Sequence, residues 1–202
     1  MSPYMYLRSV VDSGELGKPV HVDMKRISST PLWSWENWMC DTKKSGGTPI
    51  DLSIHDLDFA RDTFGEPKTV SGIYQRLNEN KDDYIVSNLV YDDFSVTATG
   101  AWYGNGLVEF NASYLAVFER GAVELKGGKV YKNGKEVDLA VKQEEVSENT
   151  GINISRADGY AGEIAYFVDC ITRGVPADRV TPESSEESVR LVEKILANSI
   201  II

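Results

Sequence analysis

The sequence predicts an α+β fold: an open, mostly antiparallel sheet with helices on one face. Three observations support this. Short β-like runs follow one another between residues 68 and 141, separated by polar or glycine-containing turns such as NENKDD and YGNG. A helical pattern precedes these runs, and two more helical patterns close the chain. Close spacing through hairpin turns favours antiparallel pairing.

The N-terminal third begins with a helix and a strand. Ser2 can cap a helix over 3–11, Pro3 suits its first turn, and Gly14 marks its end, so residues 1–14 are expected to form a linker helix. Residues 20–28 alternate between apolar and polar side chains, which indicates a strand. Residues 29–48 hold Pro31 and a glycine pair, with Pro49 directly after them, and are expected to form a long loop.

The remaining elements follow from spacing and turns. Apolar residues at helical spacing predict a helix over 49–65, inserted among the strands of 15–141. The strands are expected at 68–77, 84–91, 94–102, 108–118, 121–126, 129–131 and 136–141. A polar linker is expected over 142–154. Two closing helices, over 159–172 and 181–199, complete the segment 158–200.

Composition excludes several classes of function. The 202 residues include 31 acidic and 21 basic ones, a net charge of −10, and no basic stripe, which disfavours nucleic acid and anionic membranes. No run of 18 apolar residues and no signal-peptide pattern is present. Cys40 and Cys170 form no CxxC pair, which suits the reducing cytoplasm. Their spacing with His21 and His55 resembles no metal site, so no metal is expected.

One constellation suggests chemistry. Asp51 and His55 are four residues apart on the helix predicted over 49–65, so they share one face about 6 Å apart along the axis. An imidazole with a carboxylate one turn away can transfer protons near neutral pH. Asp58, one turn further on, is a possible second partner of His55. The spacing alone also fits an acidic residue that stabilises a helix start and a structural histidine.

The segments GELGKPVHVDMKR and SGGTPIDLSIHDLDFARDTFGEPKTVSG resemble the second domain of the glucose–fructose oxidoreductase, inositol dehydrogenase and rhizopine-catabolism family (Gfo/Idh/MocA). The resemblance extends over nearly the whole chain. It implies an NAD(P)-dependent oxidoreductase of two domains that acts on sugars, inositols or related polyols. The implied fold is the open sheet with helices described above, like the C-terminal domain of glyceraldehyde-3-phosphate dehydrogenase.

The chain departs from that family in one respect. The family's Rossmann domain, with Gly-x-Gly-x-x-Gly and a catalytic lysine in Glu-Lys-Pro, has no counterpart in this sequence. Residues 1–202 are therefore expected to form a single substrate-binding and oligomerisation domain, inactive alone. NAD or NADP is expected in the intact parent, and no cofactor is expected on this chain by itself.

The resemblance also implies roles for individual residues. His55 is expected to act as acid and base at the substrate carbinol or carbonyl, with Asp51 orienting it. Arg26 or Lys25, at the end of the first strand, and Thr48, before the helix, are expected to contact substrate. Three tryptophans of the long loop are expected to stack on a sugar face: Trp33, Trp35 and Trp38.

Two other functions remain open at this point. The domain could be a non-catalytic module for assembly or ligand binding, or a stand-alone lyase or isomerase that uses His55 and Asp51. A homo-oligomer formed through the sheet is expected, because the runs 84–91 and 108–118 place apolar residues on both faces. The resemblance points to the same contact between subunits.

Overall fold

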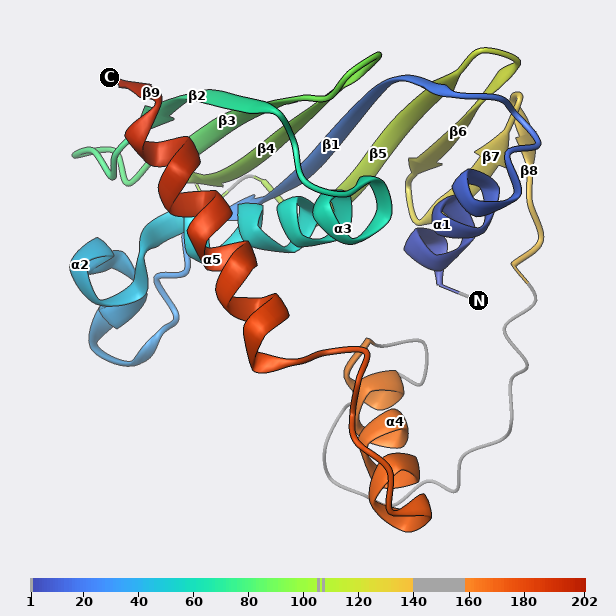
Figure 1. Cartoon of the computed structure of the whole chain (residues 1–202). Helices are drawn as coiled ribbons and strands as arrows, with labels where there is room; N and C mark the ends of the chain where they lie inside the picture. Colours follow the sequence, from blue (N-terminus) through green and yellow to red (C-terminus); the bar gives the residue numbers. More distant parts are fainter. Residues whose placement is uncertain (1, 105, 107, 140–158) are drawn as a thin grey trace.

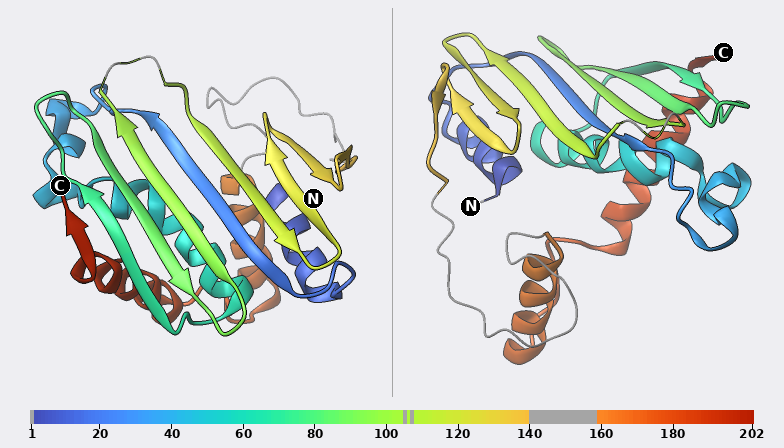
Figure 2. Two further views of the ribbon diagram at one scale, coloured as in Figure 1. Left: turned by 90° about the horizontal axis from the view of Figure 1, so that it is seen from above. Right: turned by 180° about the vertical axis from the view of Figure 1, so that it is seen from behind.

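A nine-stranded sheet dominates the computed structural model, which describes residues 2–104, 106, 108–139 and 159–202. The strand order is β8-β7-β6-β5-β1-β4-β3-β2-β9, so β1 (Pro19–Ser29) lies in the middle (Figure 2). The other strands are β2 (Thr69–Gln75), β3 (Asp83–Val90), β4 (Ser95–Tyr103), β5 (Asn111–Phe118), β6 (Gly121–Lys126), β7 (Lys129–Lys132), β8 (Lys135–Glu136) and β9 (Ser199–Ile201). The expected linker over 142–154 lies outside the described residues, as do positions 140 and 141 of the last expected strand.

Most neighbouring strands are antiparallel, as the short turns predict. The exceptions are β1 with β4 and β2 with β9, which run parallel. In the centre of the sheet, Met24 of β1 lies opposite Ala98 of β4 on one side and Tyr114 of β5 on the other. The mixed sheet with its helices is the α+β fold expected from the sequence.

The end of the chain differs from the sequence-based expectation. The helix predicted to reach Ser199 ends at Ala197, and Ser199–Ile201 forms β9 beside Gly72–Tyr74 of β2. Three residues give no periodic signal, so this strand depends on the exposed edge that β2 offers to the returning chain.

Helices cover one face of the sheet (Figure 1). They are α1 (Pro3–Ser13), α3 (Ile54–Phe64) and α5 (Pro182–Ala197), and α4 (Gly159–Arg173) stands on the same side, farther from the strands. Leu7 of α1, Leu57 of α3 and Val192 of α5 are fully buried against inward residues of the strands. In the part of the chain that the structure describes, no helix lies on the opposite face (Figure 2).

The helix ends follow the capping chemistry read from the sequence. The Ser2 hydroxyl accepts a hydrogen bond from the Met5 amide at 3.2 Å, and Gly14 ends α1 at φ +63°. The Thr181 hydroxyl accepts from the Ser184 amide at 3.2 Å, with Pro182 in the first turn of α5. Local sequence therefore determines where these two helices begin.

The segment 29–48 is more ordered than the long loop expected from the sequence. It contains a 3₁₀ segment, Trp35–Cys40, and a short helix α2, Thr42–Ser45. Glu36 and Asn37 adopt left-handed backbone conformations, with φ of 50° and 54°. Short turns of this kind lack an apolar period of their own, which is why the sequence pattern does not reveal them.

None of the helices in the described ranges is both long enough and apolar enough to cross a lipid bilayer.

Candidate active site

A cavity of about 1030 Å³ opens where the end of β1, the segment 29–48 and the start of α3 meet. Arg26, Asp51, His55 and Trp33 all line it, so the structure gathers four of the sequence-predicted site residues. Leu52, Met39 and Pro31 add apolar wall. A cavity of this size with apolar walls and a few polar groups has the character of a small-molecule site.

Asp51 lies in a single π-helical turn, Pro49–Ser53, in which the Ile54 amide donates to the Pro49 carbonyl. Such turns often occur at functional positions. Burial raises the pKa of the Asp51 carboxyl, while a hydrogen bond from Trp102 and the nearby His55 act in the opposite direction. His55 follows on α3 with an exposed side chain. The carboxylate is thus partly enclosed, and the imidazole is accessible to a ligand.

Gly100 of β4 allows the π-helical turn to lie directly on the sheet. A Cβ atom at this position would lie 3.0 Å from the Ser53 amide nitrogen and 2.9 Å from the Ser53 Cβ. Those contacts are closer than a side chain normally tolerates, so the glycine is needed for this approach. It brings Asp51 near the Trp102 indole, two residues along β4.

Arg26 is held from behind by a buried carboxylate. Its Nη2 donates to Asp56 Oδ1 at 2.8 Å and to the Tyr4 hydroxyl at 3.0 Å, and Tyr4 donates to the same Asp56 oxygen at 3.0 Å. Asp56 is fully buried, and burial raises its pKa against the opposing charge and hydrogen bonds of Arg26 and Tyr4. Because these contacts fix the guanidinium, Arg26 is a rigid element of the cavity wall.

Four predicted substrate contacts lie elsewhere. Lys25 is exposed on the opposite face of the sheet, because neighbouring residues of a strand point to opposite sides. Thr48 is fully buried and donates to Asp83 rather than lining the cavity. Trp35 and Trp38 are exposed and are not among the residues that line this cavity.

Other cavity residues were missed by the sequence reading. Trp102 is inward-facing at the end of β4, and its position two residues after Gly100 is a signal that could have identified it. Phe110 adds a second ring, and Tyr160 and Glu163 come from α4. The last two are distant in sequence from every other site residue, so only the tertiary structure places them there.

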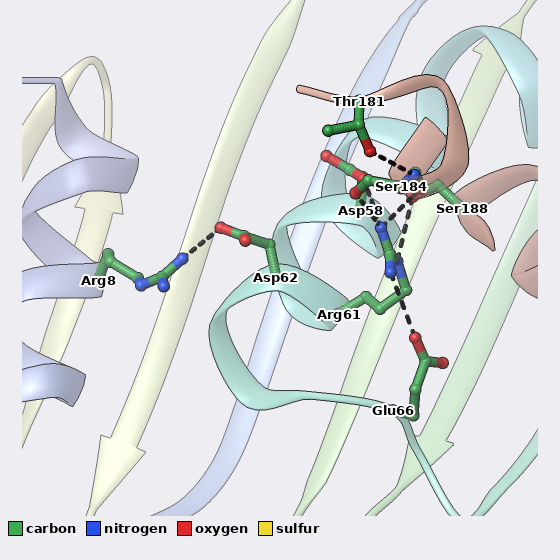
Figure 3. Close-up of polar contacts among 8 residues, drawn as sticks. All are labelled: Arg8, Asp58, Arg61, Asp62, Glu66, Thr181, Ser184 and Ser188. Carbon is green, nitrogen blue, oxygen red and sulfur yellow. Dashed lines mark hydrogen bonds and ion pairs between the residues drawn. The ribbon is translucent and has the colours of Figure 1, made fainter. Parts of the chain in front are cut away.

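The helix that carries His55 is tied to α5 and α1 (Figure 3). The Arg61 guanidinium reaches Ser184 and Ser188 of α5, and Asp62 pairs with Arg8 of α1. Asp58 accepts a hydrogen bond from Ser188 and so belongs to this cluster, which corrects its expected role as a second partner of His55. These ties fix α3 and thereby the face that it presents to the cavity.

The described residues do not fit a dinucleotide cofactor. The Gly46-Gly47 pair follows α2 rather than a strand, whereas a pyrophosphate site needs a strand, a glycine-rich turn and a helix in succession. The Thr48 amide, at the start of the following helical segment, already donates to the Asp83 carboxylate at 3.4 Å. A carboxylate there repels a phosphate. Within the described ranges, no group of three or more His, Cys, Asp or Glu side chains is placed to hold a metal ion.

Residues 4–129 match the family model described as the GFO/IDH/MocA C-terminal domain. The match contains β1, the glycine pair and all of α3, which are the segments that carry Arg26, Asp51 and His55. No curated protein matches the chain in sequence.

Solved structures share the fold at low sequence identity. An oxidoreductase from Agrobacterium radiobacter, in complex with NAD⁺, L-tartaric acid and magnesium, is 17% identical with a TM-score of 0.75, over 97% of this chain and 59% of its own. Levoglucosan dehydrogenase in complex with NADH and L-sorbose is 12% identical, with a TM-score of 0.73. The similarity covers 97% of this chain and 61% of that protein. The aldose-aldose oxidoreductase from Caulobacter crescentus, in complex with glycerol, is 16% identical, with a TM-score of 0.72. The similarity covers 98% of this chain and 58% of that protein. The chain thus spans about three fifths of these proteins.

Proposed function

Because this chain belongs to the GFO/IDH/MocA family and corresponds to its C-terminal domain, we propose that it is the substrate-binding part of an NAD(P)-dependent sugar or polyol oxidoreductase. The observation that carries this proposal is the cavity that joins Asp51, His55 and Arg26. The nicotinamide cofactor belongs to a part of the intact enzyme outside this chain. This division agrees with the two fifths of each related structure that the chain does not cover.

The walls of the cavity suit a polyhydroxylated ligand. The rings of Trp33, Trp102 and Phe110 offer flat apolar surfaces for the C–H face of a sugar. The Asp51 carboxylate accepts hydrogen bonds from hydroxyl groups, and Arg26 supplies a fixed donor. This mixture of rings and a few directed polar groups selects a sugar or polyol over a purely apolar compound.

His55 carries the proton in this proposal. When a carbinol becomes a carbonyl its hydroxyl proton must leave, and in the reverse direction a proton must be supplied. The exposed imidazole of His55 takes and returns that proton, and Asp51 one turn earlier orients it. A positioned acid–base group of this kind contributes about 10²- to 10⁴-fold to rate.

The face of the sheet opposite the described helices is proposed as the contact between subunits. Ile73 of β2, Val90 of β3 and Leu115 of β5 alternate with inward residues and are exposed by 41%, 44% and 42%. A second copy would cover them, and a stable interface of this kind buries at least about 1,000 Å² in total.

The free thiols of Cys40 and Cys170 agree with a reducing compartment, and we assign the protein to the cytoplasm.

The proposal is tested first by ligand binding. Titration of the 202-residue chain with myo-inositol, followed by NMR, should shift the indole resonance of Trp102 and the imidazole resonances of His55. His21, on the opposite face of the sheet with its Nδ1 2.9 Å from Ser95 Oγ, is an internal control that should not move. Absence of any shift at Trp102 and His55 with a panel of sugars and polyols would refute the proposed site.

Turnover is tested in the intact enzyme. His55→Ala should lower kcat about 10²- to 10⁴-fold with little change in the unfolding midpoint, because the side chain is exposed. His21→Ala should retain activity. A variant that loses stability and activity in parallel would mark His55 as structural.

The chain by itself should leave NADH fluorescence unchanged at micromolar cofactor, and saturable binding would contradict the assignment of the cofactor to another part.

A further inference from the structure

Asp83 is a buried carboxylate outside the cavity. It begins β3 and has no exposed surface. Its Oδ1 accepts a hydrogen bond from the Thr48 hydroxyl at 2.9 Å, and its Oδ2 accepts from the Thr48 amide at 3.4 Å. The Tyr74 hydroxyl of β2 is a third donor to it. Among the ion pairs of the described residues, none includes Asp83.

The turn before the π-helical segment bends around this carboxylate. Gly46 and Gly47 adopt φ of +78° and +64°, the left-handed region that favours glycine. A Cβ atom on Gly47 would lie 2.5 Å from Asp83 Oδ2, so a larger residue could not approach it in this way. Contact with Asp83 therefore explains Gly47, whereas a Cβ atom on Gly46 would instead collide with the Ile50 side chain at 2.6 Å.

Asp83 also bonds to the residue directly before the π-helical turn. Thr48 is the residue before Pro49, and Asp51 is three residues beyond Thr48. Both donors of Thr48, the amide and the hydroxyl, are directed at one carboxylate. On the far side of the turn, Ser53 packs on Gly100. The five residues that carry Asp51 are thus held between these two points.

The environment of Asp83 is unfavourable for a charged side chain. Burial raises the pKa of Asp83 to about 6 even though three hydrogen bonds lower it, so the ionised group is kept in the core at a net disadvantage. A charged acceptor makes shorter and more directional hydrogen bonds than a neutral one. A buried group that does not favour stability but fixes geometry is typical of the surroundings of a functional site.

We propose that Asp83 is a positioning residue: through Thr48 it places Asp51 against Trp102 and beside His55 in the cavity. The inference rests on the proposed function for the meaning of the cavity. It adds that the site depends on a residue that contacts no ligand. Its geometric part can be tested without any turnover, because Trp102 and His55 report on Asp51 directly.

The experiment compares variants of the full chain by NMR. Asp83→Asn replaces one of the two acceptor oxygens by an NH2 donor, so the side chain can no longer accept from both the amide and the hydroxyl of Thr48. Thr48→Val removes the hydroxyl. Both should move the Trp102 indole N–H and the His55 imidazole resonances, and both should weaken myo-inositol binding about tenfold. Thr48→Ser keeps both donors and should resemble the wild type. The His21 resonances should stay in place throughout.

The outcomes separate the two proposals. Unchanged Trp102 and His55 resonances in both Asp83→Asn and Thr48→Val would overturn the positioning role, whatever the affinity for myo-inositol. If Asp83→Asn fails to fold, Thr48→Val gives the same reading. Resonances that move in a chain that binds no sugar or polyol would support the positioning role and refute the proposed substrate class.

Discussion

Arg61 and Ser184 join α3 to α5 across 123 residues of sequence. Arg61 Nη2 donates to both the main-chain carbonyl and the hydroxyl of Ser184, each at 2.7 Å. Its Nε donates to the Ser188 hydroxyl at 3.2 Å, and the side chain is only 13% exposed. One guanidinium thus satisfies several polar groups where the closing helix crosses the helix that carries His55 (Figure 3).

Arg61→Ala should lower the free energy of unfolding by about 2–4 kcal/mol, because it leaves the part-buried acceptors of Ser184 and Ser188 without this donor. Arg190→Ala is the matched control. Arg190 is 61% exposed, and its ion pair with Glu186 lies within one helix, so its removal should cost less than about 0.5 kcal/mol. Urea denaturation of both variants measures the difference, and equal losses would contradict the assigned role of Arg61.

Arg26→Met should lower the free energy of unfolding by more than the partial exposure of Arg26 suggests. It leaves Asp56 ionisable, fully buried and without its cation, which typically costs about 3–5 kcal/mol. The double variant Arg26→Met/Asp56→Leu removes both charges and should recover most of that loss. Chemical denaturation is the measurement. A double variant as unstable as the single one would show that the pair is not the cause.

Asp83 predicts a pH dependence of stability with a definite sign. Its pKa is about 6 in the folded chain against an ordinary value of 3.8, so the folded state binds the proton more tightly. The contribution of this group to stability is therefore present at acidic pH and is lost as the pH rises through 6. As the pH rises from 4.5 to 7.5, the free energy of unfolding of Asp83→Asn should increase by about 2 kcal/mol relative to that of the wild type. If the unfolding free energies of Asp83→Asn and the wild type differ by the same amount at every pH in this range, the pKa of Asp83 is not raised.

Leu115→Glu should abolish self-association without unfolding the chain. The residue points away from the helices on β5 and is 42% exposed, so a carboxylate there is solvated in one copy but repelled in a sheet-to-sheet contact. Val189→Glu places the same charge at an exposed apolar position of α5 and should leave association intact. Sedimentation equilibrium decides the matter, and a wild-type chain at single-chain mass over a wide concentration range would refute the proposed contact.

The site was only partly readable from the sequence. Asp51 and His55 are candidates because the helix predicted over 49–65 places them on one face. In the structure they lie in a π-helical turn and in α3, and both line one cavity. The sequence leaves Arg26 and Lys25 as alternatives, since the strand period places one of them on each face but does not say which face carries the cavity. In the structure α3 packs on the face that Arg26 occupies, so Arg26 rather than Lys25 lines the cavity.

The sequence by itself determined the order of the longer helices and strands, the ends of α1, the cap of α5 and the mostly antiparallel sheet. Each depends on residues a few positions apart, through capping groups, turns and apolar period. Only the tertiary structure decided that β1 lies between β4 and β5, that β9 pairs with β2, and that Asp83 holds Thr48. Those contacts join residues separated by 35 or more positions, and their energies depend on burial and alignment that no local pattern encodes.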